Sequence, residues 1–425
     1  MNNRVVITGM GVVAPNAVGI SSFREAIKNG VSGIKLHDKL KELQFSCQIA
    51  GKPELDDDLI SCYLTPLELR NFNSSGILYG VIAGMDAWAD AKLSVNESDE
   101  PYWNYGVVFG TGSSGIDKFR EAIYKIDEGQ TRRLGSTSVI QTMSSGVSAY
   151  LSGKLGLGNQ VTSNSSACCT GTESLLIAFD RVKSGQASIM LAGSTSDSGP
   201  YIWAGFDAMK VCTFKHNDSP EKGSRPMSST ASGLVPGSGA GAFVVESLEH
   251  ALARGARIYA EILGGNINSG GQRGLGTMTA PSPLAVQKCI SHALENAKIK
   301  SSEIDAINGH LTATAMDALE IKNWSIALQR RGTEFPYINS LKGMVGHCLS
   351  ASGSIECVAS VLQIKEDFLF PNINCDDVHP DILKIIDKEK IPQQLLPHKI
   401  NILVKASFGF GDVNACIVFK KYNIK

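Results

Sequence analysis

Short runs of apolar, often β-branched residues alternate along this chain with longer segments whose apolar positions recur every three or four residues. The short runs predict β-strands, and the periodic segments predict amphipathic α-helices. Strands are predicted at 4–8, 105–109, 188–192, 243–246, 257–263, 337–340, 399–405 and 415–420, and helices at 21–28, 76–91, 144–153, 175–182 and 349–364. Alternation on this scale is typical of an α/β fold in which helices cover the sheets.

The second part of this pattern repeats the first. The strand 257–263 matches 4–8, the helix ending Asn296-Ala-Lys-Ile299 matches the one ending Asp90-Ala-Lys-Leu93, and the last two strands match 188–192 and 242–246. This order predicts two duplicated α/β halves, residues 1–254 and 255–425. We expect the functional site between them, because pockets favour such junctions.

Two glycine-rich segments lie beside predicted strands. Gly9-Met-Gly11 follows the first strand and predicts a tight turn; it lacks the third glycine of a dinucleotide-binding fingerprint. The segment 237–242 (Gly-Ser-Gly-Ala-Gly-Ala) precedes a strand rather than a helix. That placement favours close backbone packing beside a site over a cofactor-binding loop.

Cys168 marks the clearest junction between a strand and a helix. A polar, β-favouring run from Val161 leads into it, an apolar helical pattern follows at once, and Gly185 ends that pattern. Unpaired backbone N–H groups and the positive end of the helix dipole would favour the nucleophilic thiolate at this position. Taken alone, an inert buried cysteine is the commoner case.

Composition limits the class of protein. The chain has 425 residues, of which 43% are hydrophobic and 19% charged, and a formal net charge of −1, which is typical of a soluble globular protein and gives no sign of nucleic-acid binding. The ten cysteines form no Cys-x-x-Cys pair, so neither a zinc ribbon nor a disulfide framework is expected. We expect a cytoplasmic protein with no signal peptide and no membrane span.

Three later segments carry further polar residues with catalytic potential. They are Asn308-Gly-His310-Leu-Thr312-Ala-Thr314 followed by Asp317 and Glu320, Lys342-Gly-Met-Val-Gly-His347 followed by Glu356, and Ser407-Phe-Gly-Phe410-Gly-Asp412. Taken singly, the histidines would more often be ordinary core or surface residues, the lysine a surface charge, the glutamate a solvent-facing residue and the last segment a tight turn.

In this order along the chain, Ser-Ala-Cys168, Asn-Gly-His310, Lys342 with Gly-His347, and Ser-Phe-Gly-Phe410-Gly resemble the β-ketoacyl-[acyl-carrier-protein] synthases of the type I/II class. The opening Arg-Val-Val-Ile-Thr-Gly-Met-Gly and Arg225-Pro226 also match, and the resemblance covers essentially the whole chain. It implies an α/β, thiolase-like fold with duplicated βαβαβαββ halves in a five-layered α-β-α-β-α sandwich. It also implies a homodimer, with a heterodimer of related subunits as the alternative.

The resemblance further implies a decarboxylative Claisen condensation on acyl carrier protein. Cys168 would carry the acyl chain, and malonyl carrier protein would lose CO₂ and extend it by two carbons, in fatty-acid or type II polyketide or aryl-polyene-like biosynthesis. The substrates would arrive on phosphopantetheine, with no metal or redox cofactor.

Each matching residue then takes an implied role. His310 and His347 would donate hydrogen bonds to the enolate, and Lys342, paired with Glu356, would orient the site. The backbone N–H groups of Cys168 and Phe410 would form the oxyanion hole, with the Phe410 ring as a gate. Thr312 and Thr314 would line the pantetheine channel, and Asp317 and Glu320 would support it.

The chain departs from the family pattern in four places. The loop after His310 is one residue shorter and lacks the usual Gly and Pro, Asp412 stands where glycine is usual, and Ser-rich sequence replaces acidic residues after Arg225-Pro226 and in Gly237-Ser-Gly. These departures indicate a divergent member and make a dedicated type II polyketide or aryl-polyene-type pathway a serious candidate beside fatty-acid synthesis.

Particular residues separate this activity from two other functions. A non-catalytic chain-length-factor-like subunit of a ketosynthase heterodimer typically lacks the nucleophile, whereas Cys168, His310, Lys342 and His347 are all present here. A degradative thiolase acting on coenzyme A esters would need a second catalytic cysteine in a late motif, where this chain reads Gly-Phe-Gly-Asp.

A basic segment leaves a question open about partners. Lys125, Arg132 and Arg133 could contact an acidic carrier protein or simply form a solvated charged surface.

Overall fold

The computed structural model describes residues 3–423. Most strands belong to an 11-stranded sheet with the order β11-β10-β14-β15-β9-β1-β8-β7-β5-β6, with β2 (Ala17–Val18) paired to β1. The bounds along this path are β11 (Tyr337–Asn339), β10 (Ala306–Asn308), β14 (Ile402–Gly409), β15 (Val413–Lys421), β9 (Ala260–Ser269), β1 (Val5–Ala14), β8 (Gly239–Ser247), β7 (Ile189–Ser196), β5 (Tyr105–Thr111) and β6 (Val161–Thr162). Two small antiparallel sheets of two strands each pair β3 (Ile34–Leu36) with β4 (Ile49–Gly51) and β12 (Phe368–Leu369) with β13 (Leu396–Pro397).

The helices alternate with these strands. They are α1 (Ile20–Lys28), α2 (Asp38–Glu42), α3 (Asp57–Ser61), α4 (Pro66–Leu69), α5 (Ser75–Asp90), α6 (Ile116–Asp127), α7 (Ser138–Thr142), α8 (Gly146–Leu155), α9 (Thr170–Lys183), α10 (Pro200–Ala208), α11 (Leu248–Ala253), α12 (Pro283–Ala297), α13 (Asp317–Leu328), α14 (Lys342–Val345), α15 (Ser352–Glu366) and α16 (Pro380–Leu383). In the described range 3–423, no helix is long and apolar enough to cross a membrane.

The strand order repeats itself across the sheet. β1-β8-β7-β5-β6 and β9-β15-β14-β10-β11 have the same order, and in both sets the first two pairings are antiparallel and the last two parallel. The sets join where Val5–Ile7 of β1 pairs with β9. The duplication expected from the sequence is therefore present. The division at residues 254 and 255 stays a prediction.

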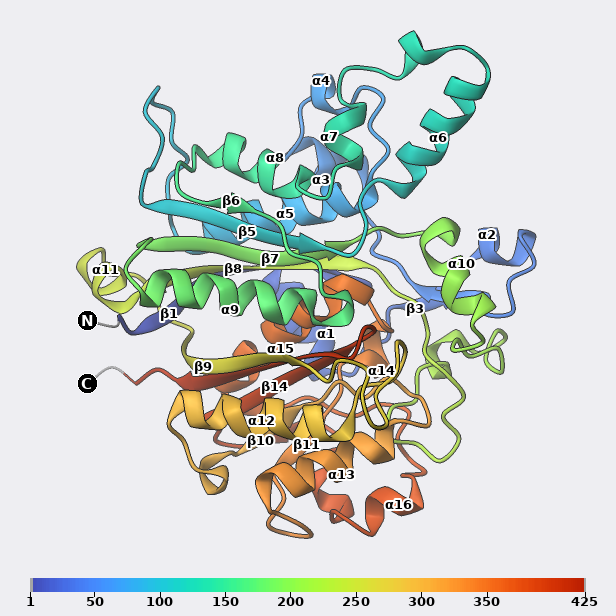
Figure 1. The fold of residues 1–425 in the computed structure, drawn as a ribbon, viewed down its shortest axis with the longest axis vertical. Coiled ribbons are helices and arrows are strands. Elements are labelled where there is room, and N and C mark those ends of the chain that lie inside the picture. Colours follow the sequence, from blue (N-terminus) through green and yellow to red (C-terminus); the bar gives the residue numbers. More distant parts are fainter. Residues whose placement is uncertain (1–2, 424–425) are drawn as a thin grey trace.

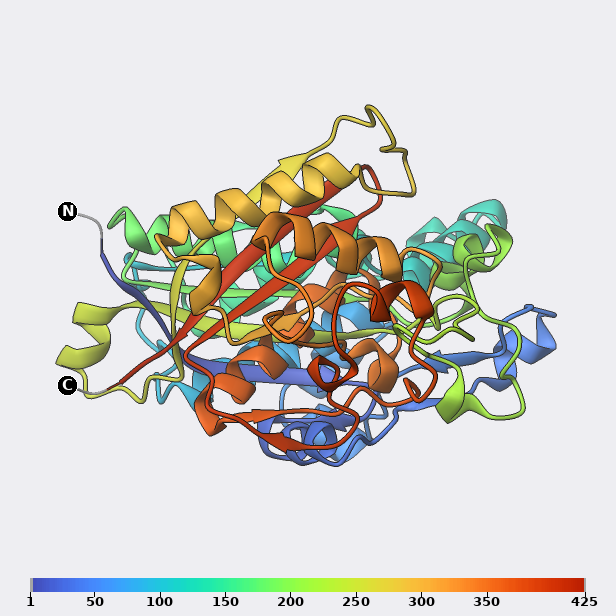
Figure 2. The same ribbon diagram turned by 90° about the horizontal axis from the view of Figure 1, so that it is seen from below.

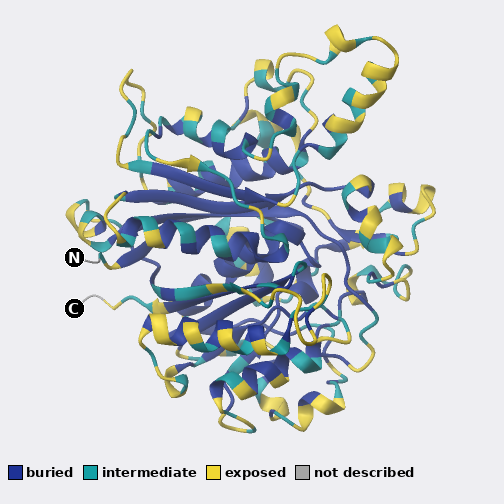
Figure 3. Cartoon of the chain, in the orientation of Figure 1, coloured by how far each residue is buried: buried dark blue, intermediate teal, exposed yellow. Residues whose placement is uncertain are grey.

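Five layers are visible in Figure 1. From top to bottom these are α5 and α8, the β1 set of strands, α9 and α15, the β9 set of strands, and α12 with α13. Figure 2 shows α12 and α13 side by side on the outer face of β14 and β15. Most strand residues and most of α15 are buried, while α9 and the outermost helices also expose part of their surface (Figure 3). The middle helices thus bring residues of both halves together in the core.

The glycine segments beside β1 and β8 are not turns. β1 continues through Gly9 and Gly11 to Ala14, so the tight turn predicted there was wrong. A Cβ at Gly11 would lie 1.9 Å from the carbonyl oxygen of Ala83, in α5, so glycine lets that helix pack directly on the strand. Gly241 in β8 likewise contacts the backbone of Ser354 in α15, which agrees with the expected close backbone packing.

Candidate active site

Cys168 lies in a 3₁₀ turn, Ala167–Cys169, between β6 and α9. Ala167 takes a left-handed conformation with φ of 49°, which aims the next residue inward. The turn is held by Thr170, whose hydroxyl accepts the N–H of Ser166 at 2.9 Å and donates to the carbonyl of Ala167 at 2.7 Å. Cys168 is therefore held just before the first residue of α9, close to the position that the sequence predicted.

Two histidines approach Cys168 from the other half of the chain. His310 follows β10, and His347 follows β11 through α14. Because β10 and β11 are parallel neighbours, their carboxyl ends meet at one edge of the sheet. The two rings are 5.5 Å apart at an angle of 85°. One ring nitrogen of each histidine and the sulfur of Cys168 all lie within 4.8 Å of one another.

The hydrogen bonds of His347 fix its tautomer. Its Nδ1 accepts the backbone N–H of Leu349 at 3.0 Å, so the ring proton of the neutral form is on Nε2. Ser352 Oγ lies 3.2 Å from the same Nδ1. Burial, together with the nearby Lys342 ammonium, lowers the pKa of both His310 and His347 well below the usual value, so both are neutral near pH 7.

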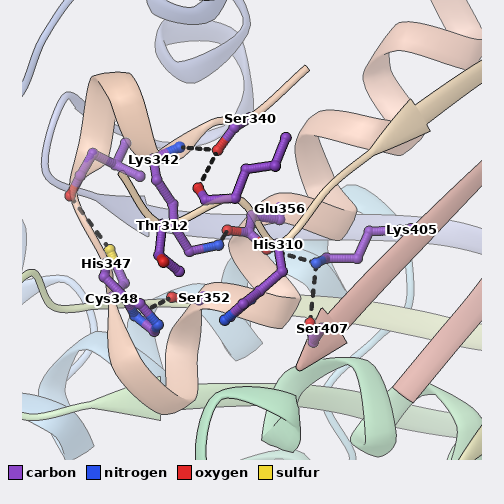
Figure 4. A network of polar contacts seen from close by, with 12 residues as sticks. His310, Thr312, Ser340, Lys342, His347, Cys348, Ser352, Glu356, Lys405 and Ser407 are labelled. Atoms are coloured by element: carbon purple, nitrogen blue, oxygen red, sulfur yellow. Dashed lines mark hydrogen bonds and ion pairs between the residues drawn. The ribbon is translucent and has the colours of Figure 1, made fainter. Parts of the chain in front are cut away.

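Lys342 is not a surface charge, and Glu356 does not face solvent. Both are 1% exposed and form an ion pair. Lys405, on β14, reaches the other oxygen of Glu356 at 2.7 Å and is itself fully buried. Figure 4 shows the two lysines on either side of Glu356, behind His310. Each of these three buried charges is thus in contact with an opposite charge.

Asp317 and Glu320 shape the loop that follows His310. Glu320 accepts the N–H groups of His310 and Leu311, both at 2.7 Å, and Asp317 accepts that of Thr312 at 2.9 Å. Leu311 stands where the family has glycine and takes a positive φ of 24°, which a bulky residue adopts only when its surroundings hold it there. The two carboxylates supply that support for the shortened loop.

Phe410 lies on the turn between β14 and β15, against Cys168. Its backbone N–H lies near the sulfur of Cys168 and acts to lower the pKa of that thiol. A Cβ on Gly409 would lie 3.2 Å from the backbone nitrogen of Cys168, so glycine allows the two backbones to approach closely. The N–H groups of Cys168 and Phe410 therefore lie near each other at one point. The Phe410 ring is 6.0 Å from that of Phe206 in α10.

Burial opposes the thiolate that the sequence pattern favoured. It raises the pKa of Cys168 to about 11, although the Lys342 charge and the Phe410 N–H act in the opposite direction. The resting side chain at neutral pH is therefore the thiol, and a base is needed to activate it.

A cavity of about 180 Å³ joins these groups. Of the residues singled out from the sequence, it is lined by Cys168, His310, Thr312, Thr314, Asp317, Glu320, His347 and Phe410. Lys342 and Glu356 lie behind this surface. Arg132 and Arg133 lie elsewhere, in an exposed 3₁₀ turn after α6.

Sequence reasoning missed Lys405. The available signal was a lysine inside the apolar strand run Ile402-Leu-Val-Lys-Ala, since a charge in a buried strand requires a partner. Its Nζ also contacts Ser407 Oγ at 3.0 Å. Lys405 therefore anchors the strand that leads to the Phe410 turn.

Comparison with known proteins supports this picture. Family models of the β-ketoacyl synthase N-terminal and C-terminal domains match residues 2–251 and 259–376. The 3-oxoacyl-[acyl-carrier-protein] synthase 2 of Vibrio harveyi is 33% identical over 426 residues, which cover 98% of each chain.

Solved structures with the same fold include ketosynthases. One is a type II polyketide synthase ketosynthase in complex with its acyl carrier protein and bound to a hexaketide, with a TM-score of 0.87, 28% identity and coverage of 99% of this chain and 100% of that one. Another, the ishigamide ketosynthase/chain length factor, has a TM-score of 0.88, 25% identity and full coverage of both chains. The thiolase-like fold expected from the sequence is confirmed, and the chain belongs to the β-ketoacyl synthase family.

Proposed function

We propose that this protein is a 3-oxoacyl-[acyl-carrier-protein] synthase that condenses an acyl group held on Cys168 with malonyl carrier protein. The observation that carries the proposal is the grouping of the Cys168 sulfur and the two histidine nitrogens within 4.8 Å at one cavity. Full-length similarity to 3-oxoacyl-[acyl-carrier-protein] synthases and to a ketosynthase bound to its carrier protein supports the reaction class.

In the first half-reaction, the Cys168 sulfur attacks the thioester of an acyl carrier protein and the phosphopantetheine thiol leaves. His347 is held as a donor at Nε2, whereas no hydrogen bond among the described residues occupies Nδ1 of His310. We therefore assign His310 as the base that accepts the thiol proton. The N–H groups of Cys168 and Phe410 stabilise the tetrahedral oxyanion.

In the second half-reaction, malonyl carrier protein loses CO₂, and the electron pair of the broken carbon–carbon bond forms an enolate. The Nε2–H group of His347 and the ring of His310 donate hydrogen bonds to the enolate oxygen. The enolate carbon then attacks the acyl thioester. A new carbon–carbon bond forms, the bond to the Cys168 sulfur breaks, and a 3-oxoacyl product two carbons longer leaves on its carrier.

Lys342, Glu356 and Lys405 provide the electrostatic background for these steps. Two positive charges and one negative charge leave a net positive field behind the histidines, which favours the enolate and the oxyanion and keeps both imidazoles neutral. Thr312 and Thr314, whose hydroxyl oxygens are 3.0 Å apart at the cavity wall, would contact the pantetheine arm. This chemistry needs no metal or redox cofactor.

The assembly and the pathway belong to the same proposal. We expect a homodimer, and the ketosynthase/chain length factor among the structural relatives makes a heterodimer the alternative. The divergent loops near His310 and Asp412 favour a polyketide or aryl-polyene-type pathway over housekeeping fatty-acid synthesis.

A mass-spectrometric elongation assay tests the proposal. Purified protein receives a panel of saturated and polyene acyl carrier proteins with malonyl carrier protein, and Cys168→Ala is the control. We expect a two-carbon extension and an acyl adduct on Cys168, both absent from the control. If no substrate gives adduct or extension, the protein is not a stand-alone synthase, and activity that returns only with a related subunit would favour the heterodimer.

A further inference from the structure

Two segments meet at the mouth of the active-site cavity. The gate turn, residues 409–412, connects β14 to β15 and carries Phe410, and the mouth loop, residues 270–282, connects β9 to α12. Thr279 and Pro281 of the mouth loop line the same cavity as Phe410. The segments are more than a hundred residues apart in sequence, so only tertiary contacts can join them.

Asp412, in the gate turn, binds the mouth loop through its carboxylate. Oδ1 accepts the backbone N–H of Ser282 at 2.7 Å, and Oδ2 accepts that of Gln272 at 2.9 Å. Because these two donors lie near opposite ends of the loop, one side chain holds both ends. Asp412 is fully buried, so these bonds are formed away from water.

Backbone contacts add to this connection. The N–H of Gly270 donates to the carbonyl of Asp412 at 3.0 Å, and the N–H of Gly411 donates to the carbonyl of Met278 at 2.7 Å. The mouth loop also leaves room for the carboxylate, since a Cβ on Gly270 or Gly276 would lie 2.1 Å or 2.3 Å from Oδ2. The loop is therefore built around the Asp412 side chain.

The mouth loop has little apolar packing of its own. Residues 271–275 and 277–279 are exposed, and Leu275 is 78% exposed. Segments with few buried apolar contacts open locally at low free-energy cost. The bonds to Asp412 are thus the principal connection between the mouth loop and the gate turn.

We propose that Asp412 is a positioning residue that clamps the mouth loop to the gate turn, so that the two walls of the cavity mouth move as one unit. A molecule must then displace both walls together to reach Cys168. This inference rests on the proposed function only for the identity of the natural ligand, the pantetheine arm of a carrier protein.

Two substitutions separate the parts of the clamp. Asp412→Asn leaves one acceptor oxygen and turns an NH₂ group toward the other N–H donor, so one of the two bonds is lost. Asp412→Gly removes both bonds and accommodates the backbone φ of 61° without strain.

Asp305→Asn is a matched control at the opposite end of β14. There a single oxygen, Oδ2 of Asp305, accepts the N–H groups of both Asn401 and Ile402, at 2.7 and 3.0 Å. An asparagine oxygen can take over both bonds at this site.

The test measures how accessible Cys168 is to reagents of two sizes. Iodoacetamide and the bulkier N-benzylmaleimide both need the same thiolate, so the ratio of their rates reports the opening of the mouth and not the pKa of Cys168. Peptide mass spectrometry separates Cys168 from the exposed Cys62. Hydrogen–deuterium exchange of residues 270–282 is followed in parallel.

We expect the bulky-to-small rate ratio to rise at least about fivefold in Asp412→Asn and further in Asp412→Gly, with faster exchange in the mouth loop in the same order. Asp305→Asn should give the same rate ratio and the same mouth-loop exchange as the unsubstituted protein. A folded Asp412→Gly with unchanged ratio and unchanged exchange would overturn the clamp; if that variant does not fold, Asp412→Asn decides. Neither measurement needs turnover, so a failure of the condensing activity would be seen separately.

Discussion

At the scale of single residues, the buried charges behind the histidines depend on one another for stability. Glu356 is buried and contacts two lysines, one from α14 and one from β14. Removing its charge leaves two buried ammonium groups facing each other, whereas removing the Lys405 charge leaves a balanced pair. The loss of the Glu356 charge should therefore lower the free energy of unfolding more than the loss of the Lys405 charge.

We predict that Glu356→Gln lowers the free energy of unfolding by about 3–5 kcal/mol and that Lys405→Met lowers it by about 1–2 kcal/mol. Guanidinium denaturation of the two variants and the parent protein measures this. A cost for Glu356→Gln no larger than that for Lys405→Met would show that the buried charges are not balanced in this way.

The two histidines predict a particular response to acid. Their folded-state pKa lies well below the unfolded value of 6.5, so the unfolded chain binds more protons once the pH falls below about 6.5. The stability contribution of each neutral histidine is present above that pH and is lost as the pH falls. Between pH 7 and pH 5 each histidine should therefore lower the free energy of unfolding by about 2 kcal/mol.

Unfolding free energies at pH 7, 6 and 5 test this response. The double variant His310→Asn/His347→Asn should lose about 4 kcal/mol less between pH 7 and pH 5 than the parent protein. Equal losses in the two proteins would mean that the histidines are already charged or exposed in the folded state.

At the scale of elements, close contact between a helix and a strand depends on single glycines. Gly11→Ala places a Cβ 1.9 Å from the Ala83 carbonyl, so α5 must move away from β1. We expect a loss of about 3 kcal/mol in thermal or chemical unfolding. Gly153→Ala, at an open position in α8, is the control and should be neutral or slightly stabilising. A tolerated Gly11→Ala would mean that α5 is not packed on the strand in this way.

The elements also explain why the site residues come from distant segments. Cys168 precedes α9, His310 follows β10 and Phe410 follows β14. The duplicated topology places α9 and α15 side by side between the two sets of strands. The nucleophile of one half thus meets the histidines of the other without any long connecting loop.

At the scale of the whole molecule, the open question is where the carrier protein docks. Arg132 and Arg133 are exposed and lie outside the cavity lining. If they attract an acidic carrier protein, reversing both charges should raise KM for acyl carrier protein by about tenfold and leave kcat nearly unchanged. Steady-state kinetics at low salt measure this. The same variant should use a carrier-free acyl thioester as well as the parent protein does, and an unchanged KM for the carrier would assign the two arginines to a solvated surface.

Much of the fold follows from local pattern. The alternation of strands and helices and the similarity of 257–263 to 4–8 predicted a duplicated α/β chain, because both signals are carried by residues adjacent in sequence. The motifs around Cys168, His310 and His347 predicted the family for the same reason. Glycine was harder to interpret. In the sequence, Gly9 and Gly11 suit a tight turn as well as they suit a strand packed closely against a helix. Only the position of α5 shows that they permit close packing.

The tertiary structure alone decided the properties that depend on contacts between distant segments. The sequence by itself determined the architecture and the residues with catalytic potential. It did not determine that Glu356 is buried between two lysines, that burial keeps Cys168 a thiol at rest, or that Asp412 binds both ends of the mouth loop. Burial and charge pairing set pKa values and hold loops in place, and they arise only when segments far apart in the chain are folded together.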